Sequence, residues 1–305
     1  TTASRQERES FINLVHEELR YILSKESRTL FREVEGMKGE MEVLHEAAQY
    51  NGMRGHKVVG ATTVGLCSML NAVNRVRPKV IVVEEAAEVL ESHLLSILTE
   101  SVQHLVLIGD HRQLRPKVSE YLMTRDSGKH GRKLDQSLME RLVKARIPFE
   151  YLNVQRRMHP QLSGFVKEYY ALKEHINIVD HPSTELRLPM HGVNHTSRVI
   201  LFDSNGLGSE QVDEGLQSPK NQFEAEMVCL VAKYLMHQDG CSPHQVTIIV
   251  PYTGQLLAVF GAARTLGLPI ASKEYPDGVV IRTFDNYQGE ENDFVVMSLT
   301  RTVKP

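Results

Sequence analysis

The stretch Val80-Ile81-Val82-Val83-Glu84-Glu85 joins four consecutive β-branched residues to two carboxylates. A continuous run of β-branched residues is typical of a strand that is buried on both faces of a parallel sheet. Open α/β sheets bind their ligands outside the carboxyl ends of such strands. The stretch therefore predicts a parallel α/β domain, with Glu84 and Glu85 at the edge of the sheet where a ligand binds.

Strand and helix patterns alternate on both sides of this stretch, which argues for βαβ units. The expected strands lie at residues 57–62, 80–83, 105–108, 149–152, 198–202, 246–250 and 294–298. The expected helices include residues 137–143 and a long amphipathic helix at residues 221–237. The pattern predicts an α/β fold with two lobes, residues 53–150 and residues 151–305.

Residues 1–52 have a different composition from the rest of the chain. They are rich in charged residues and carry apolar residues at helical spacing. Gly36 and Gly39 interrupt this pattern. We therefore expect two or three amphipathic helices there, which form a helical hairpin packed on the next domain.

The composition narrows the class of protein. A chain of 305 residues is long enough for about two domains. Its net charge of −3 does not by itself indicate a nucleic-acid binder, although a local basic groove is compatible with this charge. Cys67, Cys229 and Cys241 form no C-x-x-C pair, so they indicate neither a zinc site nor a disulfide framework. No apolar run is long enough to span a membrane, and reduced thiols favour the cytoplasm or the nucleus.

Glu84 and Glu85 are the first candidate site residues. One carboxylate could hold Mg²⁺, because this hard cation prefers oxygen ligands. The other could orient or deprotonate a water molecule that attacks a γ-phosphate. The alternative interpretation is that Glu84, Glu85 and Glu88 form the acidic first turn of a helix, where the helix dipole favours carboxylates.

Three further polar segments adjoin predicted strands. In residues 109–116, Gln113 could contact the γ-phosphate or its attacking water, and the alternative is an ordinary strand-to-helix turn. In residues 155–160, Arg157 could reach a phosphate as an arginine finger does, and the alternative is a solvated basic turn. In residues 283–293, Gln288 and Glu291 flank a glycine that lets the backbone approach a ligand, and the alternative is a turn before a strand.

In their order and spacing, these segments resemble the helicase motifs of superfamily 1B, the group that contains the nonsense-mediated-decay helicase and senataxin. Residues 83–87 resemble motif II, and residues 109–116 resemble motif III with its G-D-x-x-Q-L-x-P pattern. Residues 155–160 resemble the Q-Y-R-M-H-P motif, residues 247–255 the motif after it, and residues 283–298 motif V. Within this group the chain is most similar to the helicase region of the NFX-type zinc-finger helicases.

The resemblance implies two RecA-like lobes with parallel sheets, as in a P-loop NTPase helicase core, and ATP bound between them. Glu84 would hold Mg²⁺, and Glu85 would activate the attacking water. Gln113 and Arg157 would contact the γ-phosphate, whereas Gln288 and Glu291 would contact the rest of the nucleotide.

The same resemblance implies an ATP-dependent helicase or translocase that acts on single-stranded or partly duplex RNA. RNA-surveillance or RNA-silencing proteins are the partners it suggests. The residues expected to contact the nucleic acid are Thr62, Thr63, Gly65, Pro251, Tyr252 and Thr283.

The chain departs from the family pattern in several places. Glu84 stands where the family has Asp, and Arg156 stands where it commonly has Tyr. No G-x-x-x-x-G-K-[ST] sequence occurs in the chain. We therefore expect a piece of a larger protein, with an incomplete first lobe, that hydrolyses little ATP alone. The competing hypotheses are a non-catalytic, helicase-like RNA-binding scaffold and an unrelated two-domain α/β nucleotide enzyme.

Overall fold

The structure is a computed structural model that describes residues 4–128, 132–186, 197–203 and 207–301. The chain divides into two compact units, Thr1–Phe149 and Glu150–Pro305, and each is described by itself. Both mix helices with small, mostly parallel sheets, so the expected α/β class is confirmed. No helix in the described part of the chain is both long and apolar enough to cross a membrane.

Unit 1 is built around a two-stranded parallel sheet of β1 (Val80–Val83) and β2 (His104–Leu107). Val83 pairs with Leu107 at the carboxyl end of the sheet. The helices of this unit are α1 (Arg5–Met53), α2 (Thr63–Cys67), α3 (Leu70–Val76), α4 (Glu91–Ser96) and α5 (Leu138–Lys144), with two short 3₁₀ turns at Tyr121–Met123 and Arg125–Ser127. A small core of Val83, Ala86, Leu94, Ile97 and Leu138 joins the sheet to α4 and α5.

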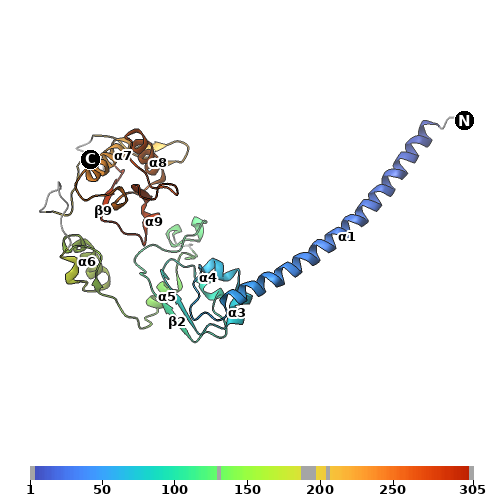
Figure 1. Ribbon diagram of the computed structural model, residues 1–305, viewed down its shortest axis with the longest axis horizontal. Helices are drawn as coiled ribbons and strands as arrows, with labels where there is room; N and C mark the ends of the chain where they lie inside the picture. Colours follow the sequence, from blue (N-terminus) through green and yellow to red (C-terminus); the bar gives the residue numbers. More distant parts are fainter. Residues whose placement is uncertain (1–3, 129–131, 187–196, 204–206, 302–305) are drawn as a thin grey trace. The chain divides into compact units, whose positions relative to one another are not determined.

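The expected hairpin at the N-terminus is wrong, because α1 is a single helix of 49 residues (Figure 1). A glycine inside a helix costs only about 1 kcal/mol relative to alanine, so two glycines do not outweigh a long run of good helix formers. Among the described residues, nothing lies within 4 Å of a Cβ placed on Gly36 or Gly39, so no packing contact with them requires a break there either. The apolar side chains of α1, such as Phe11 and Met41, are exposed.

Unit 2 is built around a three-stranded parallel sheet in the order β8-β7-β9. The central strand β7 (Val246–Val250) is buried along its whole length, as its continuous β-branched sequence predicts. It pairs with β8 (Val280–Thr283) on one side and β9 (Phe294–Met297) on the other. Helices α7 (Gln222–Met236) and α8 (Thr253–Thr265) pack on this sheet and on each other, and they bury the main core of the unit.

Smaller elements complete unit 2. A two-stranded parallel pair joins β3 (Val154–Gln155) to β4 (Val179–Asp180), and an antiparallel hairpin joins β5 (Gln211–Asp213) to β6 (Ser218–Lys220). The remaining helical elements are α6 (Pro160–Glu174), α9 (Phe284–Tyr287) and the 3₁₀ turns at Pro182–Thr184 and Pro243–Gln245.

Several expected strands agree with these elements and three do not. The strands at residues 80–83 and 246–250 are confirmed, and those at 105–108 and 294–298 are confirmed to within one residue. The burial expected on both faces of residues 80–83 is wrong, because Val80 and Val82 are exposed. Residues 57–62 and 198–202 form no strand, and the strand expected at 149–152 is replaced by β3. A strand needs a hydrogen-bonded neighbour, and these apolar runs have none among the described residues. The side chain of Val58, for example, is 87% exposed.

Candidate functional site

Glu84 and Glu85 lie at the carboxyl end of β1, as the sequence predicts. Both are exposed, and they begin a turn that separates β1 from α4. Because α4 begins only at Glu91, the alternative in which these carboxylates form the first turn of a helix is wrong. Glu85 has a φ of 50°, a left-handed backbone conformation that is uncommon for a residue with a side chain.

This turn is held against the end of β2. The Ala86 amide donates a hydrogen bond to the Ile108 carbonyl at 2.8 Å, and the Ile108 amide donates to the Val83 carbonyl at 2.8 Å. A Cβ on Gly109 would lie 2.9 Å from the Ala86 amide nitrogen. Only glycine fits this close approach, so the glycine of the 109–116 segment has a packing reason independent of any ligand.

Gln113 lies in the turn that follows β2, where its side-chain amide donates to Asp110 Oδ2 at 2.8 Å. The Arg112 amide donates to the other oxygen of Asp110 at 2.9 Å. Asp110 therefore organises the turn and orients Gln113. Because β1 and β2 are parallel and in register, Glu84, Glu85 and Gln113 follow the same edge of one sheet.

A bound Mg²⁺ would suit this edge. Mg²⁺ keeps several waters and takes one or two carboxylates together with phosphate oxygens. Glu84 and Glu85 are two exposed carboxylates in succession, so their donor chemistry fits such an ion. In the described residues no group of three or more His, Cys, Asp or Glu side chains is arranged to hold a metal without such outside ligands.

Thr62, Thr63 and Gly65 lie at the start of α2. The hydroxyl of Thr62 accepts a hydrogen bond from the Gly65 amide at 3.1 Å and thereby caps this short helix. A Cβ on Gly65 would lie 2.9 Å from that hydroxyl oxygen. Thr62 and Gly65 thus have a local structural role whether or not nucleic acid binds.

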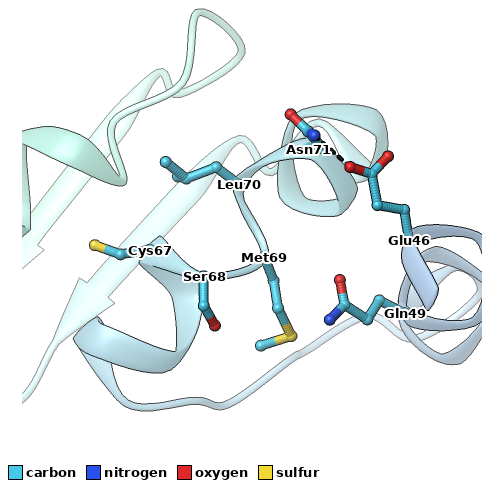
Figure 2. A pocket seen from close by; sticks show the side chains of 7 residues that line it. All are labelled: Glu46, Gln49, Cys67, Ser68, Met69, Leu70 and Asn71. Atoms are coloured by element: carbon cyan, nitrogen blue, oxygen red, sulfur yellow. Dashed lines mark hydrogen bonds between the residues drawn. The ribbon is translucent and has the colours of Figure 1, made fainter. Parts of the chain in front are cut away.

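A pocket of about 250 Å³ lies nearby, at the C-terminal end of α1 (Figure 2). Asn71 donates to the Glu46 carboxylate across one side of it, at 2.5 Å. None of the predicted site residues lines this pocket. It therefore supports no role for those residues.

In unit 2, Gln155 organises the segment that carries Arg157. Its side-chain oxygen accepts from the Arg157 amide at 3.0 Å and from the Met158 amide at 2.8 Å. Its side-chain nitrogen donates to Asp180 Oδ1 at 2.6 Å. Asp180 also accepts from Ser163 and forms an ion pair with Lys167. The hydrogen bond from Lys167 is the main reason that the pKa of Asp180 is lowered to about 2.

Arg157 and Glu291 come together in unit 2. Arg157 Nε lies 2.6 Å from Glu291 Oε2, and both side chains are mostly exposed. Gln288, which lies one residue before Gly289, has buried side-chain nitrogen and oxygen atoms without a hydrogen-bond partner in the described residues. The structure thus brings the arginine of residues 155–160 to the acidic end of residues 283–293.

Pro251, Tyr252 and Thr283 lie at the carboxyl edge of the β8-β7-β9 sheet. Val250 pairs with Thr283, so Pro251 and Tyr252 follow directly beside it. Tyr252 and Thr283 occupy the N-cap positions of α8 and α9, and neither side chain makes a capping hydrogen bond. Their hydroxyl groups are therefore not committed to capping these helices.

Sequence reasoning did not identify Glu224, Ser298, Arg301 or Asp180 as site residues. The Glu224 carboxylate accepts from the Ser298 hydroxyl at 2.6 Å and from the Thr300 amide at 2.8 Å. Gln255 is completely buried and bonds to both Asn221 and Ser298. These contacts join residues far apart in the chain, so no local spacing reveals them.

Comparison with known proteins places these features in a family. Residues 134–305 match a family model described as an AAA domain, and residues 2–120 match a second model with the same description. NFX1-type zinc finger-containing protein 1 of Mus musculus is 38% identical over 248 residues, which are 81% of this chain and 12% of that protein.

Two further relatives carry other names. Helicase required for RNAi-mediated heterochromatin assembly 1 of Schizosaccharomyces pombe is 34% identical over 249 residues, 82% of this chain and 23% of that protein. Regulator of nonsense transcripts 1 of Caenorhabditis elegans is 29% identical over 273 residues, 87% of this chain and 24% of that protein. The chain thus spans less than a quarter of the length of each of these three relatives.

Proposed function

Because this chain belongs to the AAA-domain family of superfamily 1 helicases, we propose that the full-length protein uses ATP hydrolysis to move along or unwind RNA. The similarity to two of the relatives confirms that the chain resembles the NFX-type zinc-finger helicases and the nonsense-mediated-decay helicase. AAA helicase domains imply ATP binding. We propose further that RNA is the substrate and that individual residues have the roles given below.

One observation carries the proposal for unit 1. Glu84 and Glu85 follow β1, and Gln113 follows the paired strand β2, at the same edge of the sheet. This is the edge at which α/β proteins bind nucleotides. We assign Glu84 to Mg²⁺, Glu85 to the attacking water and Gln113 to the γ-phosphate. Mg²⁺ would neutralise the charge that develops on the phosphates.

Unit 2 carries further residues that we assign to the nucleotide. Arg157 would stabilise the charge of the transferred γ-phosphoryl group, since a guanidinium can donate two parallel hydrogen bonds to its oxygens. Gln288 and Glu291 would bind the nucleotide, and the buried, unsatisfied amide of Gln288 supports a polar ligand there.

RNA would contact Thr62, Thr63 and Gly65 of unit 1 and Pro251, Tyr252 and Thr283 of unit 2. Hydroxyls and backbone amides contact phosphates without reading sequence, as a translocating motor requires. The names of two relatives mention RNAi and nonsense transcripts, so RNA-silencing or RNA-surveillance proteins are the partners we propose.

The test is RNA-stimulated ATP hydrolysis by the full-length protein. We expect Glu85→Gln to lower kcat by about 10²–10⁴-fold, since a positioned base contributes about that much, and to leave ATP binding intact. The matched control is Glu100→Gln, an exposed carboxylate before the amino end of β2. If Glu85→Gln hydrolyses ATP like Glu100→Gln, the role assigned to Glu85 is wrong.

The second candidate function is a non-catalytic RNA-binding scaffold. It is favoured by Glu84, whose longer side chain stands where the family has Asp and changes the reach toward a metal. A wild-type protein that binds single-stranded RNA but hydrolyses no ATP, with or without RNA, would establish the scaffold instead of the motor.

A further inference from the structure

Arg301 contacts Tyr252 at the carboxyl edge of the sheet in unit 2. Its guanidinium carbon lies 5.3 Å from the centre of the Tyr252 ring, and its Nε donates to the Tyr252 hydroxyl at 3.1 Å. A second nitrogen of the guanidinium lies 2.7 Å from Glu210 Oε1. The Arg301 side chain is 59% exposed, so most of it is open to solvent.

The backbone next to Arg301 is held in place by hydrogen bonds to α7. Thr300 is completely buried and has a left-handed φ of 66°. The Glu224 carboxylate accepts hydrogen bonds from the Thr300 amide and from the Ser298 hydroxyl. Because α7 anchors the end of β9 in this way, Arg301 is presented at a defined position beside Tyr252.

Glu210 is the second partner of the Arg301 guanidinium. It directly precedes the β5–β6 hairpin, and the Ser218 hydroxyl of that hairpin accepts from the Gly254 amide at 2.9 Å. A Cβ on Gly208 would lie 2.5 Å from the Phe223 Cβ, so the segment before Glu210 packs tightly on α7. The carboxylate is therefore a fixed neighbour of Arg301.

The chemistry of this trio suits one kind of ligand. A guanidinium stacked on an aromatic ring can still donate paired hydrogen bonds to a phosphate. Tyr252 is partly exposed, and an aromatic ring can stack with a base. Aromatic rings combined with positive charges are how proteins bind single strands without reading sequence. The Arg301 side chain is 59% exposed and the Glu210 side chain 21%, so a phosphate can reach the guanidinium from the solvent and take the place of Glu210 there.

We propose that Arg301 and Tyr252 together bind one phosphate and one base of single-stranded RNA, and that Glu210 is a competing carboxylate that the phosphate displaces. The proposal rests on the proposed RNA-binding function, in which Tyr252 already contacts RNA, and adds Arg301 and Glu210 to it. Glu210 then weakens RNA binding and lets the strand leave this contact readily, as a motor that steps along RNA requires.

The experiment measures binding of a fluorescent oligouridine to the full-length protein across a range of salt concentrations. We expect Arg301→Gln to weaken binding about tenfold and to reduce the slope of log K against log salt by about 0.7, the value for one lost phosphate contact on a single strand. We expect Glu210→Gln to strengthen binding about threefold, because the competing charge is gone. A gain in binding cannot result from misfolding.

Matched variants make the result specific. Arg264→Gln removes an exposed arginine at the far end of α8, and Glu226→Gln removes an exposed carboxylate on α7, so both should bind like the wild type. In the Arg301→Gln background, Glu210→Gln should give no further gain. The proposal is overturned if Arg301→Gln matches Arg264→Gln in affinity and slope, or if Glu210→Gln strengthens binding equally in both backgrounds.

The outcomes also separate this proposal from the function on which it rests. If the wild type binds oligouridine and shows RNA-stimulated ATP hydrolysis while Arg301→Gln changes neither affinity nor slope, only the present inference fails. If the wild type does not bind oligouridine at all, the proposed RNA function fails, and the Arg301 contact fails with it.

Discussion

Arg157 and Glu291 form an ion pair in unit 2, with Nε of the arginine 2.6 Å from Oε2 of the glutamate. The two residues come from motifs that are far apart in the chain, yet the fold places their charged groups in contact. Their side chains are 60% and 64% exposed, so the pair adds little to stability and both groups remain accessible to a ligand. The pair joins two residues that we assign to nucleotide binding.

Arg157→Gln should therefore separate activity from stability. We expect kcat for RNA-stimulated ATP hydrolysis in the full-length protein to fall about 10³-fold, as for loss of an arginine finger. The free energy of unfolding should change by less than about 0.5 kcal/mol, because the side chain is exposed. Steady-state kinetics and denaturant unfolding measure the two effects. Unchanged kcat, compared with Arg264→Gln as the control, would contradict the assignment.

Asp180→Asn should destabilise unit 2 in a pH-dependent way. Its hydrogen bond from Lys167 lowers the pKa of Asp180 to about 2, below the value of about 3.9 for an unfolded Asp. A lowered pKa in the folded state adds stability above the unfolded pKa, and this contribution is lost as pH falls from about 4 to about 2. The difference between wild type and variant should thus be largest near pH 7 and shrink toward pH 2.

Chemical denaturation of the full-length protein at several pH values measures this difference. Asp239→Asn, which changes an exposed aspartate in the same unit, is the matched control and should show no such trend. A gap between Asp180→Asn and wild type that stays constant from pH 7 to pH 2 would argue against a stabilising charge on Asp180.

Gly254→Ala and Gly261→Ala should have opposite effects, although both lie in α8. A Cβ on Gly254 would lie 2.7 Å from the Ser218 carbonyl oxygen, which is backbone and cannot move aside cheaply. No atom of the part of the chain that the structure describes lies within 4 Å of a Cβ on Gly261. We expect Gly254→Ala to lose about 1–3 kcal/mol through overpacking. We expect Gly261→Ala to gain up to about 1 kcal/mol through helix propensity.

Thermal and denaturant unfolding measure the change in the free energy of unfolding for both variants. If Gly254→Ala is as stable as Gly261→Ala, the β5–β6 hairpin does not pack on α8 as the structure has it.

Cys67 and Cys229 should differ in their reactivity toward an alkylating reagent. Cys229 is completely buried, and burial raises the pKa of its thiol to about 11. Cys67 is partly exposed. Because the thiolate is the reactive form, iodoacetamide should alkylate Cys67 long before Cys229 in the native protein. Peptide mass spectrometry over a time course measures the order, and denatured protein, in which all three should react alike, is the control. Equal native rates would be inconsistent with the buried position of Cys229.

Local sequence patterns were sufficient where a segment is held by its own strand or helix. The run from Val80 to Val83 and the run from Val246 to Val250 could be predicted as strands because β-branched residues favour extended backbone. Burial on both faces followed only for Val246–Val250, since Val80 and Val82 are exposed. The positions of Glu84 and Glu85 followed from the first of these strands, and that of Gln113 followed from the strand expected at residues 105–108. The ordered motifs also indicated the helicase family, which the comparisons confirm.

Prediction failed where a contact with distant residues decides the outcome. Residues 57–62 and 198–202 have strand-like sequences but no paired neighbour in the described part of the chain, and pairing is not a local property. Gly36 and Gly39 suggested a break in α1, but two glycines cost too little to interrupt a helix of good helix formers.

By itself, the sequence determined the α/β class, the strands at residues 80–83 and 246–250, the family and the order of the polar segments, because each depends on residues close together in the chain. Only the tertiary structure decided that Arg157 meets Glu291, that Asp180 holds Gln155, and that Arg301 lies on Tyr252 beside Glu210. These contacts depend on the register of parallel strands and on the packing of α7 and α8. Such long-range geometry leaves no periodic trace in the sequence.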